Sequence, residues 1–181
     1  MKICVYGASS DQIDPKYIAA GEALGRTMAE DGHSLVFGGG ATGLMGAVVR
    51  GVTQKGGTSL GIAPKFFDTE GILYRDCSEF VFTETMRERK ERMEMEADGF
   101  IMTPGGIGTL EEFFEILTLK QLGRHNKPIG ILNTDGFYHQ LESLLQTTVE
   151  KGFMDRECLA LYYMSEDPAD LLRYIKTEAA L

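Results

Sequence analysis

The chain contains no tryptophan, only 3 cysteines and 3 histidines, and fewer basic than acidic residues, 18 against 27. Cys4, Cys77 and Cys158 lie far apart, which favours neither a disulfide framework nor a zinc site. The net charge of −9 repels polyanions, so no nucleic acid partner is expected. The apolar runs are too short for a signal peptide or a membrane span. We therefore expect a cytoplasmic protein without membrane association, metal or cofactor.

Glycine, in contrast, is abundant, at 22 of 181 residues. This fraction exceeds the usual ~7%, which indicates many tight turns or backbone that must approach a ligand closely. A chain of this length can bury its own core, and it shows no linker, internal repeat or low-complexity segment. We expect a single domain over residues 1–181.

Short apolar runs alternate with longer amphipathic segments along the chain. Asp14 and Pro15 are typical of a helix N-cap and first turn, and Gly32 ends that helix. Predicted strands cover residues 2–6, 34–37, 58–63, 79–83, 100–103 and 129–132; further helices cover 44–55, 85–97, 109–122, 136–151 and 168–176; and 64–78 form a long loop. The alternation predicts a Rossmann-like, doubly wound α/β fold, with helices on both faces of a mostly parallel sheet.

The first glycine-rich loop, GGGATGLMG, spans residues 38–46 between a predicted strand and helix. Ligands bind at the carboxyl ends of the strands in such folds, and the amides of Gly39 and Gly40 fall there. The loop matches neither the dinucleotide fingerprint nor the phosphate-binding loop with its lysine. A phosphate site and a plain structural turn therefore both stay open for this segment.

The second loop, PGGIGTLEE, spans residues 104–112. Gly105, Gly106 and Gly108 can turn three amides inward, and the Thr109 hydroxyl can add a donor, which favours a phosphate nest over an ordinary turn. Glu112 lies off the polar stripe of the helix that follows, in line with apolar positions. It is a candidate site carboxylate, although a first-turn glutamate that complements the helix dipole is the alternative.

The segment MRERKERM, residues 86–93, carries four basic residues in six positions. Most charge runs are solvated surfaces, which is the alternative here. Helical spacing places Arg89 at the edge of a buried stripe formed by Met86, Met93 and Ala97, and Lys90 at the opposite edge. A partly buried arginine needs an anionic partner, for which a ligand phosphate and Glu112 are the candidates.

These motifs together resemble the LONELY GUY family of cytokinin-activating phosphoribohydrolases, which includes bacterial proteins labelled possible lysine decarboxylases. The similarity extends from CVYGASS at Cys4 to KPIGILNTDGFY at Lys127, and the family signature is PGGxGTxxE with an upstream MHxRK. Arg87 stands at the histidine position, and YGASS departs from the usual first loop. The resemblance implies a catalytic pair, Arg89 and Glu112, and a set of phosphate- or nucleotide-binding residues: Ser9, Gly39, Gly40, Met86, Lys90, Gly105, Gly106, Gly108 and Thr109.

The implied reaction is hydrolysis of the N-glycosidic bond of a nucleoside 5′-monophosphate, either AMP or a cytokinin riboside monophosphate, to free base and ribose 5-phosphate. A non-catalytic nucleotide carrier is the alternative, although a carrier would not need the Arg89–Glu112 pair. Pyridoxal-dependent decarboxylation is disfavoured, because no lysine stands in a context that suggests a Schiff base.

The predicted helix from Thr109 to Leu122 carries apolar residues on more than one face. We expect a stripe of Leu110, Phe113, Phe114 and Leu117 to dock on the sheet, while Ile116, Leu119 and Leu122 widen the apolar surface beyond the ~100° of a typical surface helix. This excess predicts a homodimer through the same helix, with the helix over residues 86–97 contributing.

Overall fold

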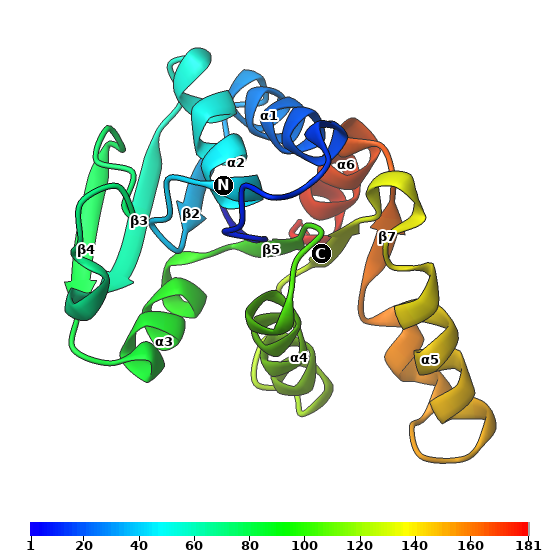
Figure 1. The fold of residues 1–181 in the computed structure, drawn as a ribbon. Helices are drawn as coiled ribbons and strands as arrows, with labels where there is room; N and C mark the ends of the chain where they lie inside the picture. The colour runs from blue at the N-terminus through cyan, green and yellow to red at the C-terminus, as the bar shows by residue number, and fades with distance from the viewer. Residues whose placement is uncertain (181) are drawn as a thin grey trace.

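The computed structural model describes residues 1–180 and contains one seven-stranded sheet (Figure 1). Its strands are β1 (Lys2–Tyr6), β2 (Ser34–Phe37), β3 (Ser59–Pro64), β4 (Glu79–Thr83), β5 (Gly99–Met102), β6 (Ile129–Leu132) and β7 (Tyr163–Ser165). They lie in the order β4-β3-β2-β1-β5-β6-β7, and every neighbouring pair is parallel.

Helices cover both faces of this sheet, which confirms the predicted doubly wound fold. They are α1 (Pro15–Glu30), α2 (Gly43–Gln54), α3 (Met86–Glu96), α4 (Ile107–Gln121), α5 (His139–Glu150) and α6 (Pro168–Glu178), with short 3-10 turns η1 (Lys65–Phe67), η2 (Thr134–Gly136) and η3 (Arg156–Ala160). Figure 1 shows α1, α2 and α6 on one face, and α3, α4 and α5 on the other.

Strand β1 runs through the centre of the sheet and contributes to both cores. Ile3 and Val5 pack in the cluster that contains residues of α1, α2 and α6, whereas Cys4 and Tyr6 pack in the cluster that contains residues of α3 and α4. This alternation follows from the two-residue period of a strand. The chain order reverses at β1, since β2 lies on one side of it and β5 on the other. A crevice at the carboxyl ends of these strands is the usual ligand position in such a fold.

Several predicted boundaries are shifted, and each shift has a local cause. The helix predicted from residue 136 begins at His139, because Asp135 and Gly136 have φ values of 55° and 67°, which a right-handed helix does not contain. Strand β7 was not predicted, because three partly exposed residues carry no periodic signal. The predicted loop over residues 64–78 contains η1 and an antiparallel bridge between Gly40 and Leu73.

Helix α4 docks through most of the predicted stripe, because Leu110, Phe113 and Leu117 pack in or against the core cluster, but one predicted member does not. Phe113, Ile116 and Leu117 are buried, but Phe114 remains 37% exposed, so its placement against the sheet was wrong. The face of α4 that packs on the sheet is therefore rotated toward Ile116. The sequence had predicted that Ile116 would lie outside the docking stripe, with Leu119 and Leu122. The rotation turns Glu112 inward, together with Phe113 and Ile116.

Candidate active site

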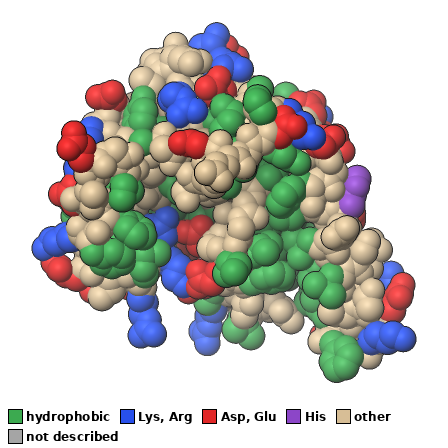
Figure 2. Space-filling view, in the orientation of Figure 1, with side chains coloured by type: hydrophobic (Ala, Val, Ile, Leu, Met, Phe, Trp, Pro, Cys, Tyr) green, Lys and Arg blue, Asp and Glu red, His purple; other side chains and the backbone are tan. Residues whose placement is uncertain are grey.

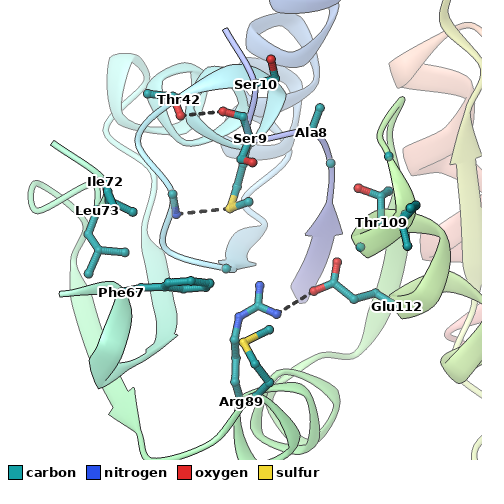
Figure 3. Close-up of a pocket in the computed structure, with 18 residues that line it drawn as sticks. Ala8, Ser9, Ser10, Thr42, Phe67, Ile72, Leu73, Arg89, Thr109 and Glu112 are labelled. Atoms are coloured by element: carbon teal, nitrogen blue, oxygen red, sulfur yellow. Dashed lines mark hydrogen bonds and ion pairs between the residues drawn. The ribbon is translucent and has the colours of Figure 1, made fainter. Parts of the chain in front are cut away.

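A cleft of about 550 Å³ opens at the carboxyl ends of β1, β2 and β5 (Figure 3). Its walls come from the loops after these strands, from the segment between β3 and β4 that contains η1, and from the first turns of α3 and α4. The lining residues are Gly7, Ala8, Ser9, Ser10, Gly38, Gly40, Thr42, Met45, Phe67, Ile72, Leu73, Met86, Arg89, Gly106, Ile107, Gly108, Thr109 and Glu112. Both predicted loops and the basic helix thus meet at one place.

A buried ion pair joins α3 to α4 in this cleft. Nη1 of Arg89 donates to Oε1 of Glu112 at 2.7 Å, and Nε of Arg89 donates to the carbonyl of Ile62 at 3.2 Å. Arg89 is 5% exposed and Glu112 is 9% exposed. Of the two anionic partners considered for Arg89, the structure therefore provides Glu112. Removing one member of such a pair typically costs ~3–5 kcal/mol, because the other charge stays buried without compensation.

Gly38 gives the guanidinium of Arg89 the space that it occupies. A Cβ atom at residue 38 would lie 2.1 Å from Nη2 of Arg89, and the ion pair limits how far that side chain can move. Glycine is required here for close approach of side chain to backbone, which is one physical reason for the first glycine-rich loop.

The electrostatics of Glu112 are set by two opposing effects. Burial raises the pKa of the Glu112 carboxyl, and the positive charge of Arg89 opposes this rise without cancelling it. Arg89 therefore favours the ionised carboxylate, but the pKa of Glu112 remains above its ordinary value. The group can consequently change protonation state at a higher pH than an exposed glutamate.

The N-terminus of α4 presents unpaired amides to the cleft. Gly106 is its N-cap residue, and among the described residues no side chain caps this end. The first amides of a helix lack intrahelical partners and carry partial positive charge. Gly106, Gly108 and Thr109 line the cleft here, and Gly105 lies behind them, where a Cβ would come within 2.1 Å of Oγ1 of Thr109. The geometry suits an anion such as phosphate.

The first glycine-rich loop differs, because protein groups already occupy its amides. The amide of Gly43 at the start of α2 donates to the Asp11 carboxylate at 2.8 Å, and the amide of Met45 donates to the Ala8 carbonyl at 3.1 Å. An anion at this helix end would meet the negative charge of Asp11. Between the two alternatives for this loop, the contacts favour a structural frame that also forms part of the cleft wall.

The predicted binding residues divide into two groups. Ser9, Gly40 and Met86 line the cleft along with the residues at the start of α4, and the carbonyl of Ser9 accepts a hydrogen bond from Thr42 at 2.6 Å. Met86 is 38% exposed rather than part of the buried stripe, so that part of the helix assignment was wrong. Gly39, Gly105 and Lys90 do not line the cleft.

Sequence reasoning missed one wall of the cleft, which the loop between β3 and β4 supplies. Phe67, Ile72 and Leu73 line the cleft from this segment, and in Figure 3 the ring of Phe67 points toward Arg89. The available signal was the adjacent aromatic pair, Phe66 and Phe67, in a loop otherwise rich in polar residues.

The fold and cleft together define a Rossmann-like α/β protein whose site suits a phosphate-bearing ligand beside a buried carboxylate. The chain belongs to the family described as possible lysine decarboxylase, whose family model matches residues 45–175. None of the helices over residues 1–180 has the length and apolar character needed to cross a membrane.

Similar proteins of known name confirm the family resemblance. A probable cytokinin riboside 5′-monophosphate phosphoribohydrolase of Oryza sativa subsp. japonica is 40% identical over 178 residues, covering 98% of this chain and 77% of that protein. A cytokinin riboside 5′-monophosphate phosphoribohydrolase of Arabidopsis thaliana is 37% identical over 175 residues, covering 97% and 81%.

Solved structures show the same fold at lower identity. The molybdenum cofactor carrier protein of Chlamydomonas reinhardtii superposes with a TM-score of 0.75 at 20% identity, covering 99% of this chain and 98% of that one. The molybdenum cofactor binding protein of Rippkaea orientalis gives a TM-score of 0.73 at 22% identity, covering 97% and 95%. At this identity the likeness concerns the fold alone.

Proposed function

We propose that this chain hydrolyses the N-glycosidic bond of a nucleoside 5′-monophosphate, releasing the free base and ribose 5-phosphate. The observation that supports this proposal most directly is the buried Arg89–Glu112 pair, which shares one cleft with the N-terminus of α4, where no side chain of the described residues caps the helix. The names of the relatives in Oryza sativa subsp. japonica and Arabidopsis thaliana support the same reaction. A carrier of the same fold would not require a buried ion pair in its ligand cleft.

The 5′-phosphate binds at the start of α4 in this proposal. The amides of Gly106, Gly108 and Thr109 donate to its oxygens, and the helix dipole stabilises its charge. Ser9 and Gly40, on the opposite wall, border the same ligand. Glu112 follows Gly108 by one helical turn, so the anchored phosphate positions the ribose near the carboxylate.

Glu112 acts on the reacting carbon of the ribose. Breaking the bond between C1′ and the base nitrogen builds positive charge on the ribose, which the ionised carboxylate stabilises. The oxygen of a water molecule bonds to C1′ as the base departs, and the base nitrogen gains one proton in the overall reaction. Arg89 holds Glu112 in place and offsets part of the cost of its burial.

The test is product analysis with the Glu112→Gln variant. Chromatography of a reaction with AMP should show adenine and ribose 5-phosphate from the parent, and turnover should fall by ~10²–10³ in the variant, because the amide keeps the shape but not the charge. Glu91→Gln, an exposed change on α3, is the matched control and should retain the parent rate.

Two results would contradict parts of this proposal. A Glu112→Gln variant with the parent rate would exclude Glu112 as the catalytic carboxylate. A parent protein that binds AMP or a prenylated analogue but returns it unchanged would be a carrier.

Both AMP and cytokinin riboside monophosphates are proposed substrates. Phe67, Ile72 and Met86 present partly exposed apolar side chains to the cleft, and such a wall accommodates an apolar substituent on the base. Comparing AMP with an isopentenyl-adenosine monophosphate under the same conditions measures how far the wall discriminates, since one methylene in an apolar pocket is worth only ~1–3 kcal/mol.

We also propose a cytoplasmic homodimer that forms through α4. The support is the apolar surface left uncovered along α4 and its C-cap residue, with Ile107, Phe114 and Leu122 at 88%, 37% and 65% exposed. The cytoplasmic location is supported by Cys4, Cys77 and Cys158, which are all free thiols.

A further inference from the structure

Lys90 follows Arg89 on α3 but makes its contacts outside the cleft. Its Nζ atom contacts Oε1 of Glu111 and lies 2.9 Å from Oε2 of Glu115, and both glutamates are on α4. The side chain of Lys90 is 20% exposed, so it is largely enclosed between the helices. Consecutive residues of α3 therefore reach α4 on two sides, Arg89 inside the cleft and Lys90 outside it.

We infer that Lys90 is a positioning residue, which fixes α4 against α3 so that Glu112 stays on Arg89, rather than a contact to the nucleotide. The inference deepens the proposed function and rests on it, because it assigns Lys90 to the support of the catalytic carboxylate. It also replaces the nucleotide-binding role that the family resemblance implied for this residue.

The geometry of the contacts explains why this lysine holds the helix effectively. Glu111 immediately precedes Glu112, and Glu115 lies one turn further along α4. One ammonium group held by two carboxylates a turn apart restrains both the rotation and the sliding of α4. An isolated exposed pair contributes little, but a network around a largely enclosed cation keeps its geometry.

The charges of the same network act on Glu112. The negative charge of Glu111 raises the pKa of Glu112, and the positive charges of Arg89 and Lys90 lower it. On the sheet side, Cys4 and Tyr6 face this region, and burial raises the pKa of both groups, so both remain neutral. Loss of the Lys90 charge would therefore move the pKa of Glu112 further upward.

The experiment compares Lys90→Met with Lys90→Arg. In Lys90→Met, kcat for AMP should fall about tenfold with KM within about twofold of the parent, which is less than the ~10²-fold loss that a 1 Å misplacement can cause. Lys90→Arg should restore most of kcat. Arg92→Met is the matched control, because Arg92 pairs with Glu96 on its own helix at 2.6 Å, and it should leave kcat unchanged.

A second readout does not depend on turnover. The carboxyl carbon of Glu112 can be titrated by NMR in protein labelled with ¹³C-glutamate, with Glu112→Gln to assign the signal. The apparent pKa should rise in Lys90→Met and return in Lys90→Arg. If Lys90→Met does not fold, Glu115→Gln removes one of the two contacts while the Lys90 charge stays, and it should lower kcat for AMP by less than Lys90→Met, with KM unchanged.

Two outcomes would overturn the inference. A higher KM with unchanged kcat would make Lys90 a nucleotide contact. If Lys90→Met changes neither the titration of Glu112 nor kcat, Lys90 forms a surface ion pair without a role in positioning Glu112. If the parent fails to release adenine from AMP, the proposed function falls, while the NMR titration still decides whether Lys90 supports Glu112.

Discussion

At Gly108, adding a single methyl group should weaken substrate binding without lowering the stability of the fold. A Cβ at this position would meet nothing within 4 Å, and the residue lies in the first turn of α4 at the cleft wall. Gly108→Ala should keep or increase stability, since alanine is favoured over glycine in helices by up to ~1 kcal/mol. The methyl group would nevertheless enter the space proposed for the phosphate. We expect KM for AMP to rise about tenfold or more, at ~1.4 kcal/mol per tenfold.

Steady-state kinetics and urea unfolding of the same preparation measure these two effects. Gly105→Ala provides the contrast, because its methyl group would clash with Thr109 and should lower stability as well. A stable Gly108→Ala protein with the parent KM would place the phosphate elsewhere.

The protonation of Glu112 predicts the pH dependence of activity. The pKa of Glu112 is raised above its ordinary value of 4.5, mainly by burial, and the reaction needs the ionised form. Activity should therefore fall as the pH drops through this raised pKa, at a higher pH than for an ordinary glutamate. In Arg89→Gln, the opposing positive charge is lost, and the acid limb of kcat/KM should move to still higher pH. An acid limb at or below pH 4.5 in the parent would contradict this prediction.

The raised pKa of Glu112 also makes the free energy of unfolding depend on pH. The folded state holds the proton of Glu112 more tightly than the unfolded chain does, so its contribution is fully present below pH 4.5 and is lost as the pH rises through the raised pKa. In urea unfolding, the stability of the parent relative to Glu112→Gln should thus decline over that interval.

The loop between β3 and β4 is the element that closes one side of the cleft. The Gly40–Leu73 bridge and a hydrogen bond from the Ala41 amide to the Ile72 carbonyl at 2.9 Å hold it there. Phe67 lines the cleft, and its neighbour Phe66, at 61% exposed, does not. If the base stacks on Phe67, Phe67→Ala should lose ~1–3 kcal/mol of stacking, which raises KM for AMP by about 5- to 150-fold.

Phe66→Ala is the matched control for this change. The two rings contact each other edge to face, with centroids 4.8 Å apart, so this variant should change KM much less. Equal KM values in both variants would show that the base lies against another wall.

Elements with a clear period were predictable from the sequence, and the others were not. Strand β1, helix α1 with its Asp14 cap, and the inward position of Glu112 follow from local spacing and capping chemistry. The edge strand β7 and the turn at η2 depend on an edge pairing and on positive φ angles, which leave no apolar period.

The residues of the candidate site divide in the same way, into those that the sequence predicts and those that only the structure reveals. Arg89 and Glu112 were found because each is a charged residue on an apolar flank of its own helix. The partners of Lys90 lie on a different helix from its own, and only the packing of α3 beside α4 reveals them. Phe67 sits in a loop without periodicity, so its place in the cleft also depends on tertiary structure.

The whole molecule leaves apolar side chains uncovered on the face that carries α4 and α5. Figure 2 shows hydrophobic side chains gathered over this region. Besides the exposed residues of α4, Leu144 on α5 is 57% exposed, and Phe153 in the turn after α5 is 86% exposed. Apolar surface of this kind on a folded chain marks an interaction site. In a dimer with a two-fold axis, the patch of one copy packs against the same patch of the other copy.

The assembly prediction follows from that surface. Light scattering at micromolar concentration should give about twice the 20.0 kDa mass of one chain, because a stable interface of ~1,600 Å² would cover the exposed face of α4. Leu122→Glu places a charge at a residue that is 65% exposed on that face and should shift the mass toward the monomer. Phe66→Glu, at a similarly exposed residue on the other side of the cleft, should leave the mass unchanged. A parent protein with the mass of one chain would exclude the dimer, whereas a dimer that persists in Leu122→Glu would place its interface away from the end of α4.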